Sequence, residues 1–174
     1  RGTAAHFGLS NEVDLIMGTF SKSFAAIGGF IAGDKDVVDY VKHQARSFIF
    51  TASLPPSVVA STREALKIII EDDDRRKRLW EISNYMRENF QKMGYDTSVS
   101  ETPVIPVIVG SNEQTFMLWK MLFDDGIYAN AVVSPAVPSN TARLRTSYIA
   151  THTDEQLDYV LEKFEENGKK LGII

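Results

Sequence analysis

Short, largely apolar runs that end at glycines alternate along this chain with longer segments whose apolar residues recur at helical spacing. Residues 13–17 form such a run before Gly18, and residues 28–33 form a second, glycine-bounded one. Runs of this length are typical of buried strands. Residues 79–93 instead carry apolar side chains every three or four positions and stop at Gly94, as an amphipathic helix does. The alternation predicts an α/β fold.

The same patterns predict the full set of helices and strands. We expect helices over residues 34–46, 56–71, 79–93 and 112–125 and from residue 153 onward, and strands over residues 13–17, 28–33, 47–50, 104–109, 127–133 and 142–149. Pro106 predicts a place at the sheet edge for its strand, because proline donates no ladder hydrogen bond. Thr153 and Gln156 have the spacing of a capping box. On the helix over 112–125 we expect an inward aromatic stripe of Phe116, Trp119 and Phe123.

Composition excludes several classes of function. Lysine and arginine number 19 against 23 aspartates and glutamates, a formal charge of −4, which disfavours general nucleic-acid binding. Without cysteine, neither disulfides nor thiolate metal sites can form, and the three histidines lack metal-ligand spacing, so we expect no metal site. No apolar run approaches the ~20 residues of a membrane span. With no signal peptide in view, we expect a cytoplasmic protein, and the abrupt start without methionine suggests the C-terminal part of a longer one.

Lys22 is the first candidate for chemistry. It lies in the loop between the first two predicted strands, among the hydroxyls of Thr19, Ser21 and Ser23. A lysine desolvated beside apolar strands becomes a nucleophilic amine, and hydroxyls with glycine-flanked amides can hold an anion. This pattern fits a pyridoxal phosphate site, and a solvated loop lysine remains the alternative. Nucleotide hydrolysis is less favoured, because Ser21 stands where the phosphate-loop pattern requires glycine.

Arg143 and Arg145 form the second candidate. Strand alternation places both on one face, opposite Leu144. An arginine held there is suited to bidentate binding of a carboxylate. Two solvent-facing arginines are the alternative.

Three ordered motifs resemble the α-oxoamine synthases, fold-type I pyridoxal-phosphate enzymes that join an amino acid to an acyl-CoA with loss of carbon dioxide. Residues 14–23 read DLIMGTFSKS with GGF following at 28–30, residues 50–56 read FTASLPP, and SPAVP at 134–138 leads to RLRT at 143–146. The similarity covers essentially the whole chain. Within the family it is strongest to bacterial serine palmitoyltransferases and 2-amino-3-ketobutyrate CoA ligase, so serine or glycine is the implied amino acid.

The resemblance implies a role for each matched position. Lys22 would be the internal aldimine lysine and the base that moves the α-proton. Thr19 and Ser21 would lie at the cofactor phosphate, and Thr51 would reach the phosphate of the neighbouring subunit's cofactor in a homodimer with shared sites. Arg145 matches the arginine that holds the substrate carboxylate.

The resemblance also implies a domain organisation. Residues 1–56 would be the end of the fold-type I cofactor-binding large domain, residues 57–94 connecting helices, and residues 95–174 a small C-terminal α/β domain. The family's ring-stacking histidine and ring-nitrogen aspartate belong to segments upstream of Arg1, so we expect the chain to be inactive alone. A non-catalytic fragment or regulatory homologue, acting as a binding or dimerisation module, is the alternative.

Overall fold

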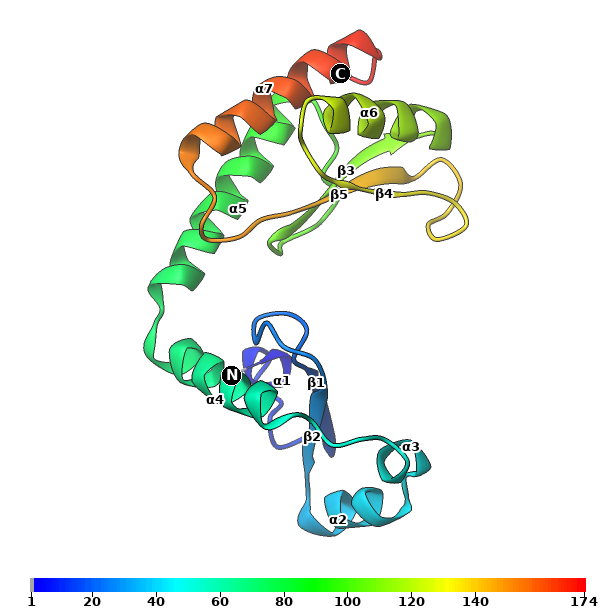
Figure 1. The fold of residues 1–174 in the computed structure, drawn as a ribbon. Helices are drawn as coiled ribbons and strands as arrows, with labels where there is room; N and C mark the ends of the chain where they lie inside the picture. The colour runs from blue at the N-terminus through cyan, green and yellow to red at the C-terminus, as the bar shows by residue number, and fades with distance from the viewer. Residues whose placement is uncertain (1) are drawn as a thin grey trace. The chain divides into compact units, whose positions relative to one another are not determined.

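The computed structural model describes residues 2–174. The chain divides between Asp72 and Asp73 into two compact units, and each is described by itself (Figure 1). The division falls within the stretch expected to hold connecting helices. No helix among residues 2–174 is both long enough and apolar enough to cross a bilayer.

The first unit contains four helices and a two-stranded sheet. Its elements are α1 (Thr3–His6), β1 (Leu15–Thr19), β2 (Gly29–Gly33), α2 (Lys35–Gln44), α3 (Arg46–Ile49) and α4 (Pro56–Glu71). β1 and β2 pair antiparallel, with Met17 opposite Ile31. Both glycine-bounded runs are therefore strands, as predicted, and Pro56 occupies the first turn of α4 as proline commonly does.

The strand predicted over residues 47–50 is wrong, because this stretch belongs to helix α3. The amide of Ile49 donates to the Ala45 carbonyl at 3.0 Å, and the amide of Phe50 donates to Arg46 at 3.0 Å. A run of three apolar residues, Phe48 to Phe50, carries no periodicity that distinguishes a strand from a helical turn.

No residue described in the first unit is buried. On β1, Leu15, Ile16 and Met17 remain 42%, 40% and 75% exposed. Consecutive apolar residues are typical of strands covered on both faces, and residues 2–72 do not supply that cover for β1.

The second unit has its own core. It contains α5 (Asp74–Met93), β3 (Val104–Gly110), α6 (Asn112–Asp124), β4 (Asn130–Val132), β5 (Ala142–Ser147) and α7 (Asp154–Lys170). The strands form an antiparallel sheet in the order β3-β5-β4. Pro106 lies on β3, at an edge of this sheet, as predicted.

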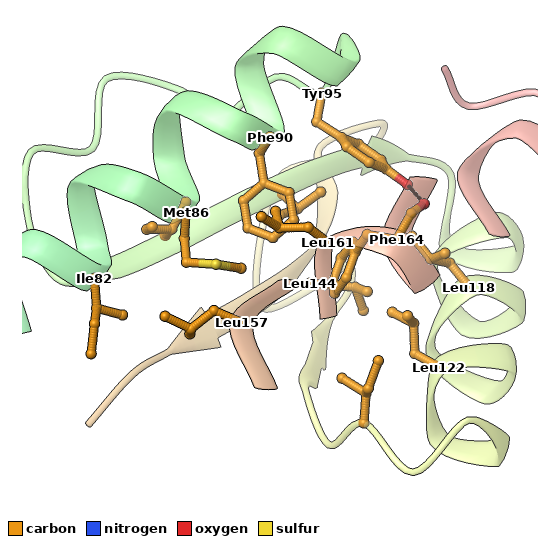
Figure 2. Close-up of a cluster of buried hydrophobic side chains, with 13 residues drawn as sticks. Ile82, Met86, Phe90, Tyr95, Leu118, Leu122, Leu144, Leu157, Leu161 and Phe164 are labelled. Atoms are coloured by element: carbon orange, nitrogen blue, oxygen red, sulfur yellow. Dashed lines mark hydrogen bonds between the residues drawn. The ribbon is translucent and has the colours of Figure 1, made fainter. Parts of the chain in front are cut away.

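The three helices of the second unit pack with its sheet around a hydrophobic core (Figure 2). The predicted apolar stripe of α5 is confirmed, and the buried side chains include Ile82, Met86 and Phe90 from α5 and Leu157, Leu161 and Phe164 from α7. The rings of Phe90 and Phe164 lie edge-to-face at 4.9 Å. The Tyr95 hydroxyl donates to the Phe164 carbonyl at 2.7 Å. Burial of each such side chain stabilises the folded state by about 1.5–3 kcal/mol.

The face predicted for α6 is wrong. Thr115, Leu118 and Leu122 are its buried residues, whereas Phe116 and Phe123 are 50% and 51% exposed. Trp119 packs partly against the core. Two apolar stripes fit the same helical period, and the buried one is interrupted by Thr115, whose hydroxyl is satisfied by the Ser111 carbonyl at 2.7 Å. The inward stripe is therefore rotated by about one residue from the aromatic one.

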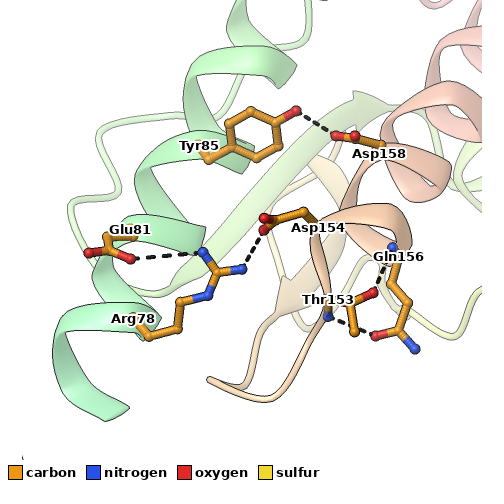
Figure 3. A network of polar contacts seen from close by, with 7 residues as sticks. All are labelled: Arg78, Glu81, Tyr85, Thr153, Asp154, Gln156 and Asp158. Carbon is orange, nitrogen blue, oxygen red and sulfur yellow. Dashed lines mark hydrogen bonds and ion pairs between the residues drawn. The ribbon is translucent and has the colours of Figure 1, made fainter. Parts of the chain in front are cut away.

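The start of α7 is fixed by polar contacts (Figure 3). The predicted capping box is present: the Gln156 amide donates to the Thr153 hydroxyl at 3.3 Å, and the Thr153 amide donates to the Gln156 side chain at 3.1 Å. Arg78 on α5 pairs with Asp154. These contacts hold the first turns of α7 against α5.

Candidate functional site

Lys22 lies in the hairpin loop that joins β1 to β2. The Phe20 amide donates to the Gly28 carbonyl at 2.9 Å, and the Ala26 amide donates to Phe20 at 2.9 Å, which closes the loop. The Ala25 amide donates to the Lys22 carbonyl at 2.9 Å. Lys22 itself is exposed, so residues 2–72 do not supply the desolvation expected for this amine.

Two hydroxyls lie together at the start of this loop. The side-chain oxygens of Thr19 and Ser21 are 2.9 Å apart, and the Ser21 amide donates to Thr19 at 3.3 Å. The Thr19 hydroxyl is also 3.4 Å from the Gly28 carbonyl. Hydroxyls and amides gathered immediately before a lysine are the donors that a phosphate monoester needs. The residues present therefore fit the phosphate end of pyridoxal phosphate.

The backbones of β1 and β2 approach closely at Gly29, where the loop ends. A Cβ added to Gly29 would lie 2.5 Å from the Gly18 carbonyl oxygen of the paired strand. Only glycine permits this approach. The second glycine of the GG pair in the first motif is thus explained by the close approach of the paired strand.

Aromatic rings hold the two ends of the loop. The Phe20 ring lies 5.3 Å from that of Phe24 and 5.8 Å from that of Phe30. These rings line one side of an apolar cavity of about 530 Å³, which Leu54 and α4 border on the other side. The cluster anchors the loop beside Lys22.

Thr51 follows α3 in the same unit. Its hydroxyl donates to the Ser47 carbonyl, and it lines a cavity of about 480 Å³ together with Lys42 and His43. No hydrogen bond described within residues 2–72 joins Thr51 to Thr19, Ser21 or Lys22. The sequence does not predict that Lys42 and His43 approach Thr51, because their approach depends on the turn between α2 and α3.

Arg143 and Arg145 lie on the second unit. They alternate on β5 with the buried Ala142, Leu144 and Thr146, so the predicted shared face is confirmed. The Arg143 Nε donates to the Thr141 carbonyl at 2.9 Å. Arg145 is exposed and lies opposite Pro106 and Asn130 in the sheet. No hydrogen bond to its guanidinium is described within residues 2–174, which leaves its planar fork free for a ligand.

The model of the family described as aminotransferase class I and II matches residues 1–164. The chain belongs to this family. A serine palmitoyltransferase of Sphingobacterium spiritivorum is 52% identical over 172 residues, covering 99% of this chain and 43% of the relative. An 8-amino-7-oxononanoate synthase of Thermosipho melanesiensis is 47% identical over 174 residues, covering 100% and 44%.

The fold of the chain is also similar to that of a solved relative. A serine palmitoyltransferase variant from S. paucimobilis with a bound PLP–myriocin aldimine has a TM-score of 0.93 at 35% identity, covering 100% of this chain and 44% of that one. The α/β fold-type I class and the resemblance to α-oxoamine synthases are therefore confirmed. The chain spans less than half the length of these relatives.

Proposed function

We propose that this chain is part of a pyridoxal-phosphate-dependent enzyme that condenses serine or glycine with an acyl-CoA. Carbon dioxide and free coenzyme A leave, and a 2-amino ketone forms. The observation that carries this proposal is the hairpin loop in which the Thr19 and Ser21 hydroxyls, 2.9 Å apart, immediately precede Lys22. The names of the relatives, serine palmitoyltransferase and 8-amino-7-oxononanoate synthase, support the same chemistry.

Each site residue has a role in this proposal. Thr19 and Ser21 donate hydrogen bonds to the phosphate of the cofactor, and the Lys22 Nζ binds it covalently. The cofactor, when bound, withdraws electrons from the bonds to the amino acid Cα. The Lys22 amine, once the amino group of the substrate had displaced it from the cofactor, would move the proton at that Cα. Arg145 binds the amino-acid carboxylate through two parallel hydrogen bonds and so orients the Cα.

The proposal extends to assembly and location. The protein is a cytoplasmic homodimer, and Thr51 of each subunit reaches the cofactor phosphate of its neighbour. The Thr51 hydroxyl donates to Ser47 in this structure, so it exchanges that partner for a phosphate oxygen when it binds.

Release of coenzyme A tests the reaction. In the protein that carries this chain, we expect free thiol to form only when amino acid and acyl-CoA are both present. Serine with a long-chain acyl-CoA and glycine with acetyl-CoA separate the two substrate classes. Lys22→Ala should abolish release, whereas Lys35→Ala on α2 should not. Cofactor binding without release under either condition would favour a binding module instead of an enzyme.

A further inference from the structure

The face of the sheet that carries Arg145 lies opposite the hydrophobic core. On β5 its neighbours Leu144 and Thr146 are buried, and Ala131 on β4 packs against the core from the same side. Successive residues of a strand point to opposite faces, so Arg145 points away from the core. The sequences of β3, β4 and β5 contain no aspartate or glutamate. No carboxylate of these strands therefore neutralises the guanidinium of Arg145.

Asn130 is the polar neighbour of Arg145 across the sheet. β4 and β5 lie side by side (Figure 1) and pair antiparallel, with Asn130 directly opposite Arg145. Residues in this relationship point to the same face, and their Cβ atoms are about 4.5–5.5 Å apart. On its other side Arg145 is opposite Pro106 on β3, whose ring has no hydrogen-bonding group. Arg145 is therefore flanked by one amide side chain and one apolar ring.

The side-chain amide of Asn130 is available to a ligand. Asn130 is exposed, and no hydrogen bond of its side chain is described for the part of the chain that the structure covers, residues 2–174. An asparagine NH2 group has two donors, and a carboxylate has about four sites that accept hydrogen bonds. A bidentate arginine occupies two of those sites. A carboxylate bound by Arg145 can therefore accept a further hydrogen bond from the neighbouring strand.

We propose that Asn130 binds the amino-acid substrate by donating a hydrogen bond from Nδ2 to the carboxylate that Arg145 holds. The inference rests on the proposed function, which assigns Arg145 to that carboxylate. Arg145 supplies the charge, and Asn130 adds a neutral donor from the adjacent strand that restricts how the carboxylate can rotate. Two strands of the sheet then fix the orientation of the substrate Cα, which is what positioning for reaction requires.

Amine titrations of the protein loaded with pyridoxal phosphate test this contact, with the cofactor spectrum as the readout. Serine has a carboxylate and a hydroxyl, alanine has the carboxylate without the hydroxyl, and ethanolamine has the hydroxyl without the carboxylate. Asn130→Ala should raise the dissociation constants of serine and alanine about tenfold and leave that of ethanolamine unchanged. Val132→Ala, on the same face of β4 opposite Arg143, is the matched control and should change none of them.

Asn130→Asp separates a binding role from a structural one. Aspartate keeps the size of asparagine but replaces the NH2 donor with a negative charge, which repels the substrate carboxylate and competes for the guanidinium of Arg145. Serine and alanine should therefore bind more weakly to Asn130→Asp than to Asn130→Ala. A residue that only maintained the packing of β4 would give the opposite order, because aspartate fills the same space.

The remaining outcomes overturn the inference. Weaker binding of serine and ethanolamine with alanine unaffected would assign the amide to the serine hydroxyl instead. Equal behaviour of Asn130→Ala and Val132→Ala, or no binding of serine and alanine by the parent protein, would also contradict it. None of these titrations requires an acyl-CoA. A protein that binds serine through Asn130 but releases no coenzyme A would therefore contradict the proposed reaction and leave the inference standing.

Discussion

The side-chain oxygens of Thr19 and Ser21 lie 2.9 Å apart at the end of β1, and Lys22 comes next in the chain. The pair is held by the Ser21 amide, which donates to Thr19 at 3.3 Å. Because the two hydroxyls already face one another, little side-chain freedom is lost when they share one anion.

Removing the Ser21 hydroxyl should weaken cofactor binding. Ser21→Ala leaves the contact of Thr19 with Gly28 in place, so the loop should keep its path. Loss of a hydrogen bond to a charged phosphate should raise the dissociation constant of pyridoxal phosphate about tenfold, measured by absorbance titration. Ser23→Ala removes a hydroxyl on the other side of Lys22 and is the control. Equal effects of the two variants would contradict the assigned role of Ser21.

Arg145→Lys should weaken amino-acid binding and spare cofactor loading. Lysine keeps the charge but loses the planar fork, at a cost of about tenfold to a hundredfold in affinity. Arg143→Lys on the same face is the control and should be tolerated better, because Arg143 already bonds to Thr141. An amino-acid titration of the cofactor spectrum measures both. Damage confined to Arg143→Lys would show that the other arginine binds the carboxylate.

Mixed dimers test whether the site is shared between subunits. In a mixed dimer of a Lys22→Ala chain with a Thr51→Ala chain, both defects fall in the same site only if Thr51 acts across the interface. One of the two sites in a mixed dimer then has neither defect, so activity should partly recover on subunit exchange. Exchange demonstrated by labelled subunits without any recovery would argue against sharing.

The second unit should lose stability at alkaline pH through Tyr95, which is buried, and Tyr148, which is partly buried. Burial raises the pKa of Tyr95 and of Tyr148 above the ordinary value of about 10. Above about pH 10 the unfolded chain ionises first, so the stabilisation is complete below that pH and is lost as the pH rises toward the folded-state pKa, at up to about 1.4 kcal/mol per pH unit for each tyrosine. Denaturant unfolding followed by fluorescence of Trp80 and Trp119, both in this unit, measures the change.

Tyr95→Phe supplies the comparison for this pH dependence. At neutral pH it should cost about 1 kcal/mol, because the hydrogen bond to Phe164 is lost. At alkaline pH its stability should fall less steeply than that of the parent chain. Identical slopes for the two proteins would exclude Tyr95 as the titrating group.

The sequence predicted most of this fold where periodicity and end signals agree. β1, β2, α5 and α7 follow their patterns, and Gly94 and Thr153 mark helix ends where they were expected. Residues 47–50 were assigned to the wrong kind of element, because their three apolar residues fit either a strand or one helical turn. On α6 the two stripes differ by one residue, and packing of Leu118 and Leu122 against the sheet decides between them.

The sequence likewise predicted some features of the candidate site and not others. The two apolar runs over residues 13–17 and 28–33 predicted the loop that holds Lys22, and strand alternation predicted the common face of Arg143 and Arg145. The pairing of Thr19 with Ser21 follows from local geometry that the sequence alone did not determine. The approach of Lys42 and His43 to Thr51 depends on helix α3, which was expected to be a strand. Because this short element was predicted as a strand, the sequence did not indicate that Lys42, His43 and Thr51 line one cavity.

The attachment point of the cofactor tests the central claim most directly. The protein loaded with pyridoxal phosphate is reduced with borohydride, digested and mapped by mass spectrometry. We predict a pyridoxyl group on Lys22 and its absence after Lys22→Ala. A pyridoxyl group on a different lysine, or none on a protein that binds the cofactor, would contradict the account.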